Sequence, residues 1–554
     1  MTEGLTVEFD VPATMRDGTV LKANIYRPAG AGPWPVLLTR TPYGKDFAFG
    51  GAGIDPAAAV KRGYILIIQD TRGRFESEGI WRPMAAEVED GADSVTWAAG
   101  IPGSDGTVAM HGGSYLGFTQ WAAAHGAPPA LKAIAPAVTW CDPFEGLGYR
   151  GGALEFGMLV GWSFGVGVDV LAKRHPDDLA ARLAAVRAHA TQFDEIAESG
   201  FFSLPLQDFS PLESQRSEAI YFEAVTADRS RDTDLARRLS VDEWTAAHDI
   251  PAFNIGGWYD IFLAGTIANY QAGGRDSRLL IGPWSHGAMN NPVGERNFGF
   301  GAQAGSIELQ QDLGSLQLDW FDRWCKGAEA PETPPIRIFV MGANVWRYEA
   351  EWPLRRARTT PFHLDGAGGL AESEPAGAPD EYVYDPNDPV PTLGGATLLP
   401  PEFRSGAYDQ RPVEQRADVL TYSTVPLTED VEVTGPIEVR LWASSSAPNT
   451  DFVARLCDVF PDGRSINLTD GIVRGEALEP EKPHEFVIDL WATSNVFRAG
   501  HRIRVDITSS SFPRWDRNPN TGHELGADAE LQKAQQRIYH DPEHPSRILL
   551  PVVP

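Results

Sequence analysis

Short apolar runs, each ended by turn residues, recur through the first half of the chain. The segment LTVEFDVPATMRDGTVLKANIYRP alternates apolar and polar positions on both sides of residues 16–18, which predicts two strands around a turn. Runs without alternation follow in PVLLTRTPYG, GYILIIQDTRGR, GTVAMHGGS, LKAIAPAV, PAFNIGGWYD and SRLLIGPWSHG. Continuous Val/Ile/Leu runs separated by helical segments are typical of parallel strands that are covered on both faces. The pattern therefore predicts an α/β layered domain.

Two changes of pattern divide the chain further. Between about Asp142 and Ala247, the stretch HPDDLAARLAAVRAHATQFDEIAESG has a helix-start signal and apolar residues at helical spacing, so we expect a helical insertion over one end of the sheet. After Trp352, Pro/Gly-rich loops lead to alternating runs such as VEVTGPIEVRLWASS and HRIRVDITSSS with no helix between them, which predicts an antiparallel β-sandwich. The predicted divisions are 1–141 and 248–352 for two parts of the α/β core, 142–247 for a helical cap, and 353–554 for the β-sandwich.

Composition narrows the classes of partner. The chain has 554 residues, and its 42% of hydrophobic residues is ample for large cores. A formal net charge of −28 argues against binding to nucleic acid or to an anionic membrane, because both would repel it. The three cysteines are far apart in sequence, so neither a disulfide framework nor a zinc cluster is indicated.

The expected location follows from the apolar segments. The first residues lack the basic start and apolar core of a signal peptide, and we expect no apolar run long enough to span a membrane. We therefore expect a soluble cytoplasmic protein that needs no metal or other cofactor. A homodimer is compatible with the sequence, which leaves the oligomeric state open.

The candidate nucleophile is Ser114 in GGSYLG. The strand GTVAM, the glycines and the helix-friendly stretch after them give the strand–turn–helix context of a nucleophile elbow. One feature departs from the usual G-x-S-x-G spacing, because Leu116 stands where a small residue is expected and Gly117 follows one position later. On this motif alone, a nucleophile and an ordinary loop serine are equally compatible with the sequence.

Partners for such a serine stand at the ends of two later strands. Asp260 follows the run PAFNIGGWY, and His286 follows SRLLIGPWS. Catalytic residues of open α/β sheets gather at the carboxyl ends of strands, and the order serine, acid, histidine is that of α/β-hydrolases. The alternatives are a helix N-cap for Asp260 and a surface-loop residue for His286. His111 is nearest to Ser114 in sequence, but it lies inside the predicted strand and is expected to be structural.

Taken together, five ordered motifs resemble the cocaine esterase / X-prolyl dipeptidyl aminopeptidase family. They are TPYGK (41–45), QDTRGRFESEG (69–79), GGSYLG (112–117), GGWYD (256–260) and GPWSHG (282–287), and PRWDRNPNTG (513–522) extends the similarity into the last domain. The resemblance implies a serine hydrolase with an α/β-hydrolase core, a helical cap and a C-terminal jelly-roll domain.

The resemblance also assigns roles. The family uses G-x-S-Y-x-G, which removes the anomaly at Gly117 and implies that Ser114 is the nucleophile, His286 the general base and Asp260 its orienting acid. It further implies an oxyanion hole made of the hydroxyl of Tyr43 and the backbone N–H of Tyr115. Such donors stabilise charge that appears only in the transition state. The charged residues of the second motif are expected to form a structural ion-pair network rather than to take part in catalysis: Asp70, Arg72, Arg74 and Glu78.

The residues that follow Asp260 and those of the cap indicate which acyl group the substrate carries. Asp260 is followed by the apolar residues Ile-Phe-Leu-Ala, whereas the family's amino-acid ester hydrolases carry acidic residues there to pair a free amino group. Trp162 and Phe164 in the cap, together with Phe262, predict an apolar or aromatic acyl pocket, and Trp162 and Phe262 resemble the cocaine esterase arrangement. We expect another aromatic of the cap in that arrangement to be replaced near Leu147, so benzoyl specificity does not follow.

The sequence thus predicts a serine carboxylic ester hydrolase that acts through an acyl-enzyme on small esters with an apolar or aromatic acyl group. Three alternatives stay open: an amide acylase of the cephalosporin side-chain type, an X-prolyl dipeptidyl peptidase, and a carbohydrate-binding protein with a vestigial triad.

Overall fold

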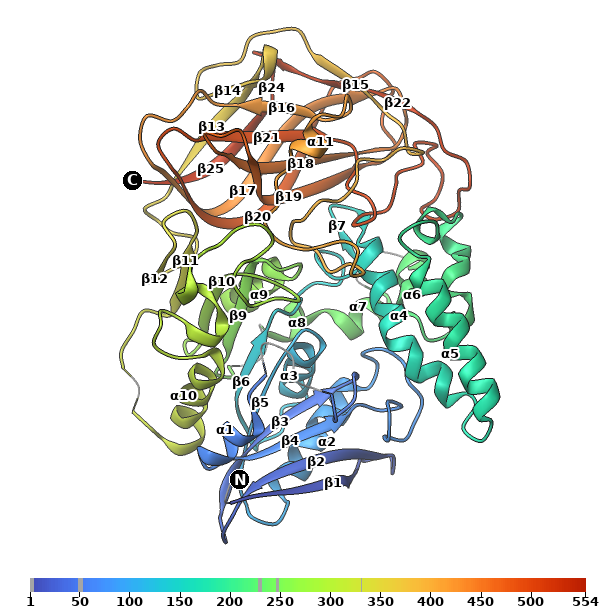
Figure 1. Ribbon diagram of the computed structural model, residues 1–554, viewed down its shortest axis with the longest axis vertical. Helices are drawn as coiled ribbons and strands as arrows, with labels where there is room; N and C mark the ends of the chain where they lie inside the picture. The colour runs from blue at the N-terminus through green and yellow to red at the C-terminus, as the bar shows by residue number, and fades with distance from the viewer. Residues whose placement is uncertain (1–3, 48–52, 228–231, 246–248, 330) are drawn as a thin grey trace.

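A mixed ten-stranded sheet forms the lower half of the molecule (Figure 1). The computed structural model describes residues 4–47, 53–227, 232–245, 249–329 and 331–554. The strands of this sheet lie in the order β1-β2-β4-β3-β5-β6-β9-β10-β11-β12, and all neighbours from β4 to β11 are parallel. Their bounds are β1 Leu5–Thr14, β2 Val20–Pro28, β3 Trp34–Thr41, β4 Ile65–Asp70, β5 Ser104–Gly113, β6 Leu131–Ala137, β9 Phe253–Tyr259, β10 Arg278–Ser285, β11 Ile336–Val340 and β12 Val345–Glu349. The predicted α/β core is confirmed, and β11 and β12 extend it beyond the predicted runs.

Helices cover both faces of this sheet, which explains the lack of alternation in its strands. Leu37 and Leu38 are neighbours in β3, are both fully buried and belong to different cores. The core of Leu37 is closed by α1 and α10, and that of Leu38 by α2 and α3. The helices of this domain are α1 Pro56–Lys61, α2 Glu87–Ala99, α3 Tyr115–His125, α9 Leu263–Ala272 and α10 Leu313–Lys326.

The predicted helical insertion forms a cap beside the carboxyl ends of the strands, with α4 to α7 in teal to green at the right of Figure 1. It begins with a small hairpin and continues through helices: β7 Tyr149–Arg150, β8 Ala153–Leu154, α4 Phe156–Lys173, α5 Leu179–Asp194, α6 Ile220–Thr226, α7 Asp234–Leu239 and α8 Val241–Thr245. The predicted helix start at the Pro-Asp-Asp sequence is confirmed, because the side chain of Asp178 accepts a hydrogen bond from the amide of Ala181 at the N-terminus of α5. The predicted division at 247–248 lies outside the described residues.

Helix α4 corrects the expectation about apolar runs. Its 18 residues reach the length and the mean hydropathy, 1.3, that a membrane-spanning helix needs. Within the protein, 61% of this window is buried, as in the core helix of a globular domain. Length and composition alone are therefore weak evidence for a span here.

The C-terminal part is a β-domain, drawn in orange and red at the top of Figure 1. Eleven of its described strands form one sheet, in which neighbouring strands are antiparallel except for β14 and β16, while β23 and β24 form a separate two-stranded sheet. The alternating runs predicted as strands coincide with β17, β18, β20 and β21, and their inward side chains share one core. The elements are β13 Arg358–Asp365, β14 Gly369–Ala371, β15 Asp380–Tyr384, α11 Arg411–Glu414, β16 Leu420–Ser423, β17 Val431–Ser445, β18 Thr450–Val459, β19 Ser465–Gly475, β20 His484–Phe497, β21 Arg502–Thr508, β22 Ala534–Ile538, β23 His540–Asp541, β24 His544–Pro545 and β25 Arg547–Val553.

A buried cluster of charges joins the cap to the β-sandwich. Arg514 pairs with Asp470 at 2.5 Å and lies 3.8 Å from Glu155, the residue before α4. The indole of Trp515 donates to Glu155 at 3.0 Å, and the guanidinium of Arg150 stacks on an aromatic ring of β20. Burial raises the pKa of Glu155, whereas the guanidinium groups of Arg514, Arg150 and Arg455 together outweigh burial at Asp470 and lower its pKa. The start of α4 is therefore fixed by the C-terminal domain.

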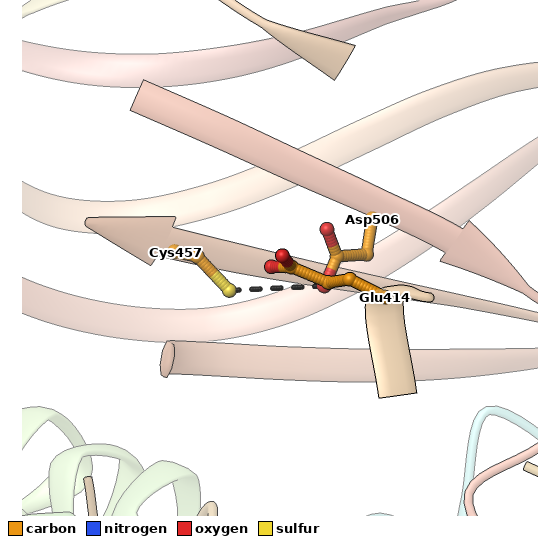
Figure 2. A group of neighbouring side chains, drawn as sticks. All are labelled: Glu414, Cys457 and Asp506. Carbon is orange, nitrogen blue, oxygen red and sulfur yellow. Dashed lines mark hydrogen bonds between the residues drawn. The ribbon is translucent and has the colours of Figure 1, made fainter. Parts of the chain in front are cut away.

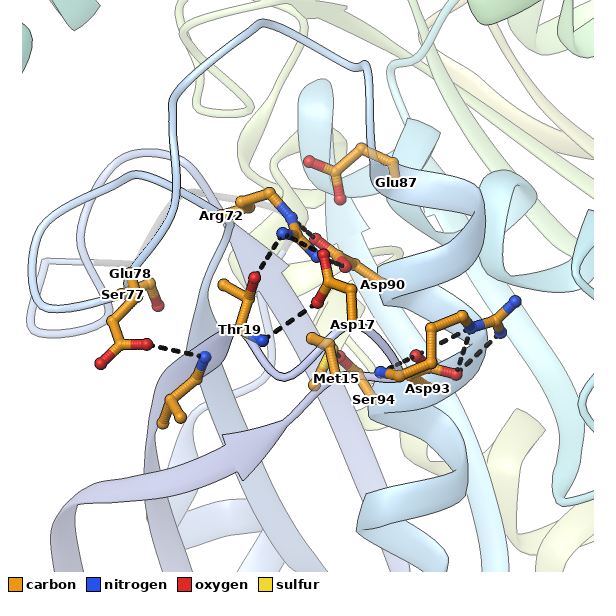
Figure 3. A network of polar contacts seen from close by, with 12 residues as sticks. Met15, Asp17, Thr19, Arg72, Ser77, Glu78, Glu87, Asp90, Asp93 and Ser94 are labelled. Carbon is orange, nitrogen blue, oxygen red and sulfur yellow. Dashed lines mark hydrogen bonds and ion pairs between the residues drawn. The ribbon is translucent and has the colours of Figure 1, made fainter.

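The charged loop after β4 is tied to the rest of the core by ion pairs (Figure 3). Arg72 donates to both oxygens of Asp90 in α2, at 2.9 and 2.6 Å, and pairs with Asp17 of the first hairpin at 2.7 Å. The carboxylate of Glu78 accepts from the backbone amide of Val20. These contacts join the loop to α2 and to the first hairpin, as expected for a structural network.

The buried cluster generates a prediction about stability. Arg514→Met leaves the carboxylates of Asp470 and Glu155 with reduced compensation, and we expect a loss of about 3–5 kcal/mol, because an uncompensated buried charge is costly. The measurement is the apparent melting temperature at pH 7. The matched control is Arg355→Met, which removes an exposed pair with Glu351 and should cost less than about 1 kcal/mol. Equal shifts for the two variants would contradict the assigned role of the cluster.

Candidate active site

The backbone at Ser114 makes a sharp turn between β5 and α3. Ser114 has φ 59° and ψ −125°, a conformation that non-glycine residues adopt only under strain. Two glycines make room for the turn: a Cβ on Gly112 would lie 2.7 Å from the Cβ of Leu116, and one on Gly117 would lie 2.7 Å from the Cβ of Thr139. Since Gly117 allows α3 to approach the neighbouring strand, its position one step beyond the usual spacing is a requirement of packing.

The three side chains named from the sequence meet at the carboxyl edge of the sheet. Ser114 follows β5, Asp260 follows β9 and His286 follows β10. The Nε2 atom of His286 lies 3.0 Å from Ser114 Oγ, and its Nδ1 atom lies 2.7 Å from Oδ1 of Asp260. Asp260 is fully buried, and the ring of Phe262 packs edge-on against the imidazole at 5.2 Å. This is the geometry in which a histidine can take the serine proton while a carboxylate fixes its tautomer.

Tyr43 lies beside the serine, on the loop after β3. Burial raises the pKa of its hydroxyl, while contacts with Trp162 and Ser114 lower it in part, so that the phenol stays protonated. The indole N–H of Trp162 donates to the Tyr43 oxygen at 3.0 Å. Because that contact occupies an acceptor position of the oxygen, the phenolic proton is available for donation toward the site. The sequence predicted Trp162 only as a pocket wall, and nothing in its local pattern signals this contact.

Arg74 holds the same loop in place. Its Nε atom donates to the carbonyl of Pro42 at 2.7 Å, and one Nη atom donates to the carbonyl of Val166 in α4 at 3.0 Å. Asp70 lies beneath the loop, and its carboxylate accepts from the backbone amide of Lys45 at 2.6 Å. Burial raises the pKa of Asp70 to about 6 despite the nearby ammonium of Lys45. Arg74 thus connects the tyrosine loop with the cap, a positioning function that the prediction of a simple ion-pair network missed.

The backbone amide of Tyr115 is the second predicted oxyanion donor. Tyr115 is the first residue of α3, so its N–H has no acceptor within the helix. Its side chain is anchored below the site, where the hydroxyl donates to Glu87 at 2.8 Å and accepts from the amide of Met84 at 3.0 Å. Glu87 in turn pairs with the buried Arg40. This network fixes the first turn of the helix.

A narrow apolar pocket of about 20 Å³ adjoins the serine on the side of the cap. Trp162 and Phe262 line it, as predicted, together with Leu147. Phe164 does not, which corrects the prediction: its ring packs against His189 and another phenylalanine of α5 inside the cap. Two residues along a helix point in widely different directions, so Trp162 and Phe164 cannot face the same pocket. The other lining residues are Tyr43, Met84, Ser114, Tyr115, Trp140, Met158, Leu159, Ile220 and Leu398.

A wider cavity of about 350 Å³ meets the same serine from the other side. His286 lines it, with Gly287 and Met289 of the following loop. His111 also lines this cavity, and both its ring nitrogens are buried without a hydrogen-bond partner. Burial lowers the pKa of this imidazole to about 4, so it is neutral at pH 7. The sequence predicted that His111 lies within the strand, but it did not predict that His111 borders a cavity.

Among the described residues, one group of potential metal ligands occurs, and it lies in the β-sandwich (Figure 2). Ligand atoms of Glu414, Cys457 and Asp506 lie within 4.8 Å of one another. Arg504 pairs with Glu414 at 2.5 Å and Arg455 with Asp506 at 3.4 Å. These guanidinium groups compensate the two carboxylates only in part, because burial and the charge of Glu414 still raise the pKa of Asp506 to about 7. The three cysteines, all of them described, form no disulfide.

Comparison with known proteins agrees with this geometry. Residues 17–288 match the model of the X-Pro dipeptidyl-peptidase (S15) family, and residues 328–549 match that of the X-Pro dipeptidyl-peptidase C-terminal non-catalytic domain. The chain is 39% identical to a cocaine esterase of Rhodococcus sp. (strain MB1 Bresler), over 99% of each chain.

Two solved structures are similar over nearly their whole length. One is an aminopeptidase from a marine sediment Thaumarchaeota archaeon, with a TM-score of 0.81 and 25% identity over 100% of this chain and 97% of the other. The other is an α-amino acid ester hydrolase, with a TM-score of 0.77 and 26% identity over 99% of this chain and 97% of the other.

The contact between Trp162 and Tyr43 generates a prediction. Tyr43→Phe removes the predicted oxyanion donor and should lower kcat about 10²–10³-fold on a p-nitrophenyl ester. Trp162→Phe keeps the aromatic ring but removes the N–H, and should lower kcat about fivefold to tenfold because the phenol loses one orienting hydrogen bond. The double variant should be no slower than Tyr43→Phe alone, since the indole acts through the phenol. Independent, multiplicative losses would contradict this coupling.

Proposed function

The chain belongs to the family of serine hydrolases that includes cocaine esterase and the X-Pro dipeptidyl-peptidases, and on this premise we propose that it is a carboxylic ester hydrolase that works through an acyl-enzyme on Ser114. The observation that carries the proposal is the pair of contacts made by His286, 3.0 Å to Ser114 Oγ and 2.7 Å to Asp260. A serine becomes nucleophilic when a neighbouring base removes its proton during attack.

The first half-reaction forms the acyl-enzyme. As Ser114 Oγ attacks the ester carbonyl, its proton passes to His286 Nε2, and Asp260 stabilises the resulting imidazolium. The carbonyl oxygen becomes an oxyanion that accepts from the hydroxyl of Tyr43 and the backbone N–H of Tyr115. The C–O bond to the alcohol then breaks, and His286 returns its proton to the leaving oxygen.

The second half-reaction uses the same groups for water. Water enters where the alcohol left, His286 takes one of its protons, and the hydroxide attacks the acyl carbon. Collapse of the second tetrahedral intermediate releases the carboxylic acid, and His286 returns the proton to Ser114. Since both halves depend on one base and one oxyanion hole, each of these groups is required for turnover.

The narrow pocket supports an apolar acyl group. Its described lining includes aromatic and aliphatic side chains and no carboxylate. An α-ammonium group bound there would lose its hydration without gaining a counter-ion, which is costly in a dry pocket. This disfavours amino-acyl esters and X-Pro peptides as substrates, although the family contains enzymes for both. An amide acylase would use the same triad, so competition between an ester and its amide in one assay separates that alternative.

Replacement of the serine tests the proposal directly. Ser114→Ala should keep the fold, abolish hydrolysis of p-nitrophenyl butyrate and prevent labelling by a fluorophosphonate probe, because only an activated serine reacts. Circular dichroism of the variant is the control for folding. Turnover at the wild-type rate in this variant would refute the assignment. Faster cleavage of an X-Pro-nitroanilide than of the ester by the wild type would instead favour a peptidase.

The size of the narrow pocket generates a second prediction. Its free volume of about 20 Å³ is little more than one water molecule needs, so short acyl groups should be preferred over benzoyl. Met158→Ala enlarges this pocket and should raise the ratio of kcat/KM for benzoyl over acetyl esters by about tenfold or more. The reason is that a difference of one methylene group in an apolar pocket changes the discrimination between two substrates by at least about tenfold. Met289→Ala makes the same change in the wider cavity and should leave the ratio as in the wild type. A shift of equal size in both variants would contradict the assignment of the acyl group to the narrow pocket.

A further inference from the structure

Arg74 is a buried cation beside the loop that carries Tyr43. It is only 2% exposed, whereas an arginine is almost never buried to this extent unless it is paired. Its Nε atom donates to the carbonyl of Pro42, the residue before Tyr43, at 2.7 Å. The guanidinium lies 4.9 Å from the centre of the Trp81 ring and 5.2 Å from that of Phe75. A positive charge is therefore held in an aromatic environment next to the tyrosine loop.

Carboxylates compensate this charge only in part. Asp169 of α4 lies 3.4 Å from Nη1 of Arg74, but its carboxylate also accepts a hydrogen bond from the backbone amide of Phe75. Asp70 shares its charge with the ammonium of Lys45, which lies 3.5 Å away. Burial lowers the pKa of the Arg74 guanidinium, and the nearby carboxylates do not outweigh it. A guanidinium stays protonated in proteins even so.

The charge of Arg74 acts on the phenol of Tyr43. Burial raises the pKa of this phenol, whereas the contacts with Trp162 and Ser114 and the charge of Arg74 lower it in part. The phenol oxygen already accepts from the indole of Trp162 at 3.0 Å, so its own proton is directed toward another acceptor. A neighbouring cation stabilises the negative charge that remains on the oxygen as this proton moves away. A phenol polarised in this way is a stronger donor to an oxyanion.

We infer that Arg74 is an electrostatic positioning residue of the oxyanion hole, whose buried charge makes Tyr43 a stronger donor to the developing oxyanion. The inference rests on the proposed function, because it concerns the charge that appears on the ester carbonyl during attack by Ser114. It goes beyond the hold on the loop, since it requires the charge itself and not only the contacts of the guanidinium. Arg74 is not among the described residues that line either cavity, so its effect reaches the substrate through the phenol.

An effect of this kind is specific to the transition state. The bound ester is neutral, so a charge behind the phenol changes its binding little, whereas the tetrahedral intermediate carries a full negative charge. Loss of an interaction that exists only in the transition state lowers kcat and kcat/KM equally. At an effective dielectric constant of about 20, one charge several ångströms away changes a rate by about tenfold or more.

Neutral and charged replacements of Arg74 separate the charge from the contacts. Arg74→Met removes the charge and should lower kcat and kcat/KM for p-nitrophenyl butyrate about tenfold, with KM almost unchanged. Arg74→Gln is a second neutral variant that keeps hydrogen-bonding groups, and it should lose as much. Arg74→Lys loses the planar fork of the guanidinium but keeps a charge, so it should retain most of the rate.

The matched control is Lys173→Met. Lys173 of α4 donates to the carbonyls of Gly73 and Ser77, at 3.0 and 3.3 Å. It joins the same loop to the same helix through contacts that do not involve Tyr43. We therefore expect this variant to stay within about twofold of the wild-type rate, because a single hydrogen bond to a carbonyl contributes little. Circular dichroism and fluorophosphonate labelling check that each variant is folded and keeps its activated serine.

Three further measurements report on the phenol and would not respond to a purely structural contact. In the Tyr43→Phe background, Arg74→Met should cost less than about twofold, since no phenol remains to be polarised. Replacement of Tyr43 by 3-fluorotyrosine, whose phenol is more acidic, should restore part of the rate lost in Arg74→Met. n-Propylboronic acid, which forms a tetrahedral anion on an activated serine, should bind to Arg74→Met about tenfold more weakly than to the wild type.

The outcomes separate this inference from the proposed function. Equal losses in Arg74→Lys, Arg74→Gln and Lys173→Met would show that the contact between loop and cap matters and not the charge, and would overturn the inference. A tenfold effect of Arg74→Met that persists without the phenol would overturn it as well. Both results leave the esterase intact. A wild type that neither hydrolyses p-nitrophenyl butyrate nor reacts with fluorophosphonate would overturn the proposed function itself.

Discussion

The strained turn at Ser114 is the constraint on which the rest of the site depends. Its positive φ costs roughly 1–3 kcal/mol, which the surrounding sheet and helix must offset. The turn lifts the hydroxyl clear of the strand and starts α3 with its first amide toward the same space. The close approach of Gly117 to Thr139, and the hydrogen bond from the Thr139 hydroxyl to the Ser114 carbonyl at 2.9 Å, hold this geometry. The proposed nucleophile and one proposed oxyanion donor are thus two results of one backbone conformation.

Much of this architecture could be predicted because its causes are local. Continuous apolar runs predicted the parallel strands. Ser114, Asp260 and His286 could be selected as candidates because each follows the end of one of those strands. The sequence did not show which side chains of α4 point toward Ser114. Trp162 and Phe164 lie in the same apolar stretch, and the packing of α4 on the core, for example through its contact with Arg74, decides which of them lines the pocket. The two cavities depend on how distant loops pack, so their sizes could not be deduced from any local pattern.

Charged side chains lie near the proposed catalytic groups, but among the described residues they do not line the two cavities beside Ser114. Guanidinium groups orient both proposed oxyanion donors, Arg74 through the loop of Tyr43 and Arg40 through Glu87 below Tyr115. The described lining of both cavities is free of Asp, Glu, Lys and Arg. Because no fixed ion competes there, the charge that develops on the substrate interacts mainly with the phenol, the amide and the imidazole. This separation allows a chain with a strong net negative charge to stabilise an anion.

The buried charges between the cap and the β-sandwich also limit how genes of this kind can recombine. Arg150 and Glu155 come from one half of the chain, and Asp470 and Arg514 come from the other. A crossover between them that brings in a half with a different charge pattern leaves an ion in the interior without its counter-ion, at a cost of several kcal/mol. We therefore expect substitutions at these four positions to compensate one another in charge.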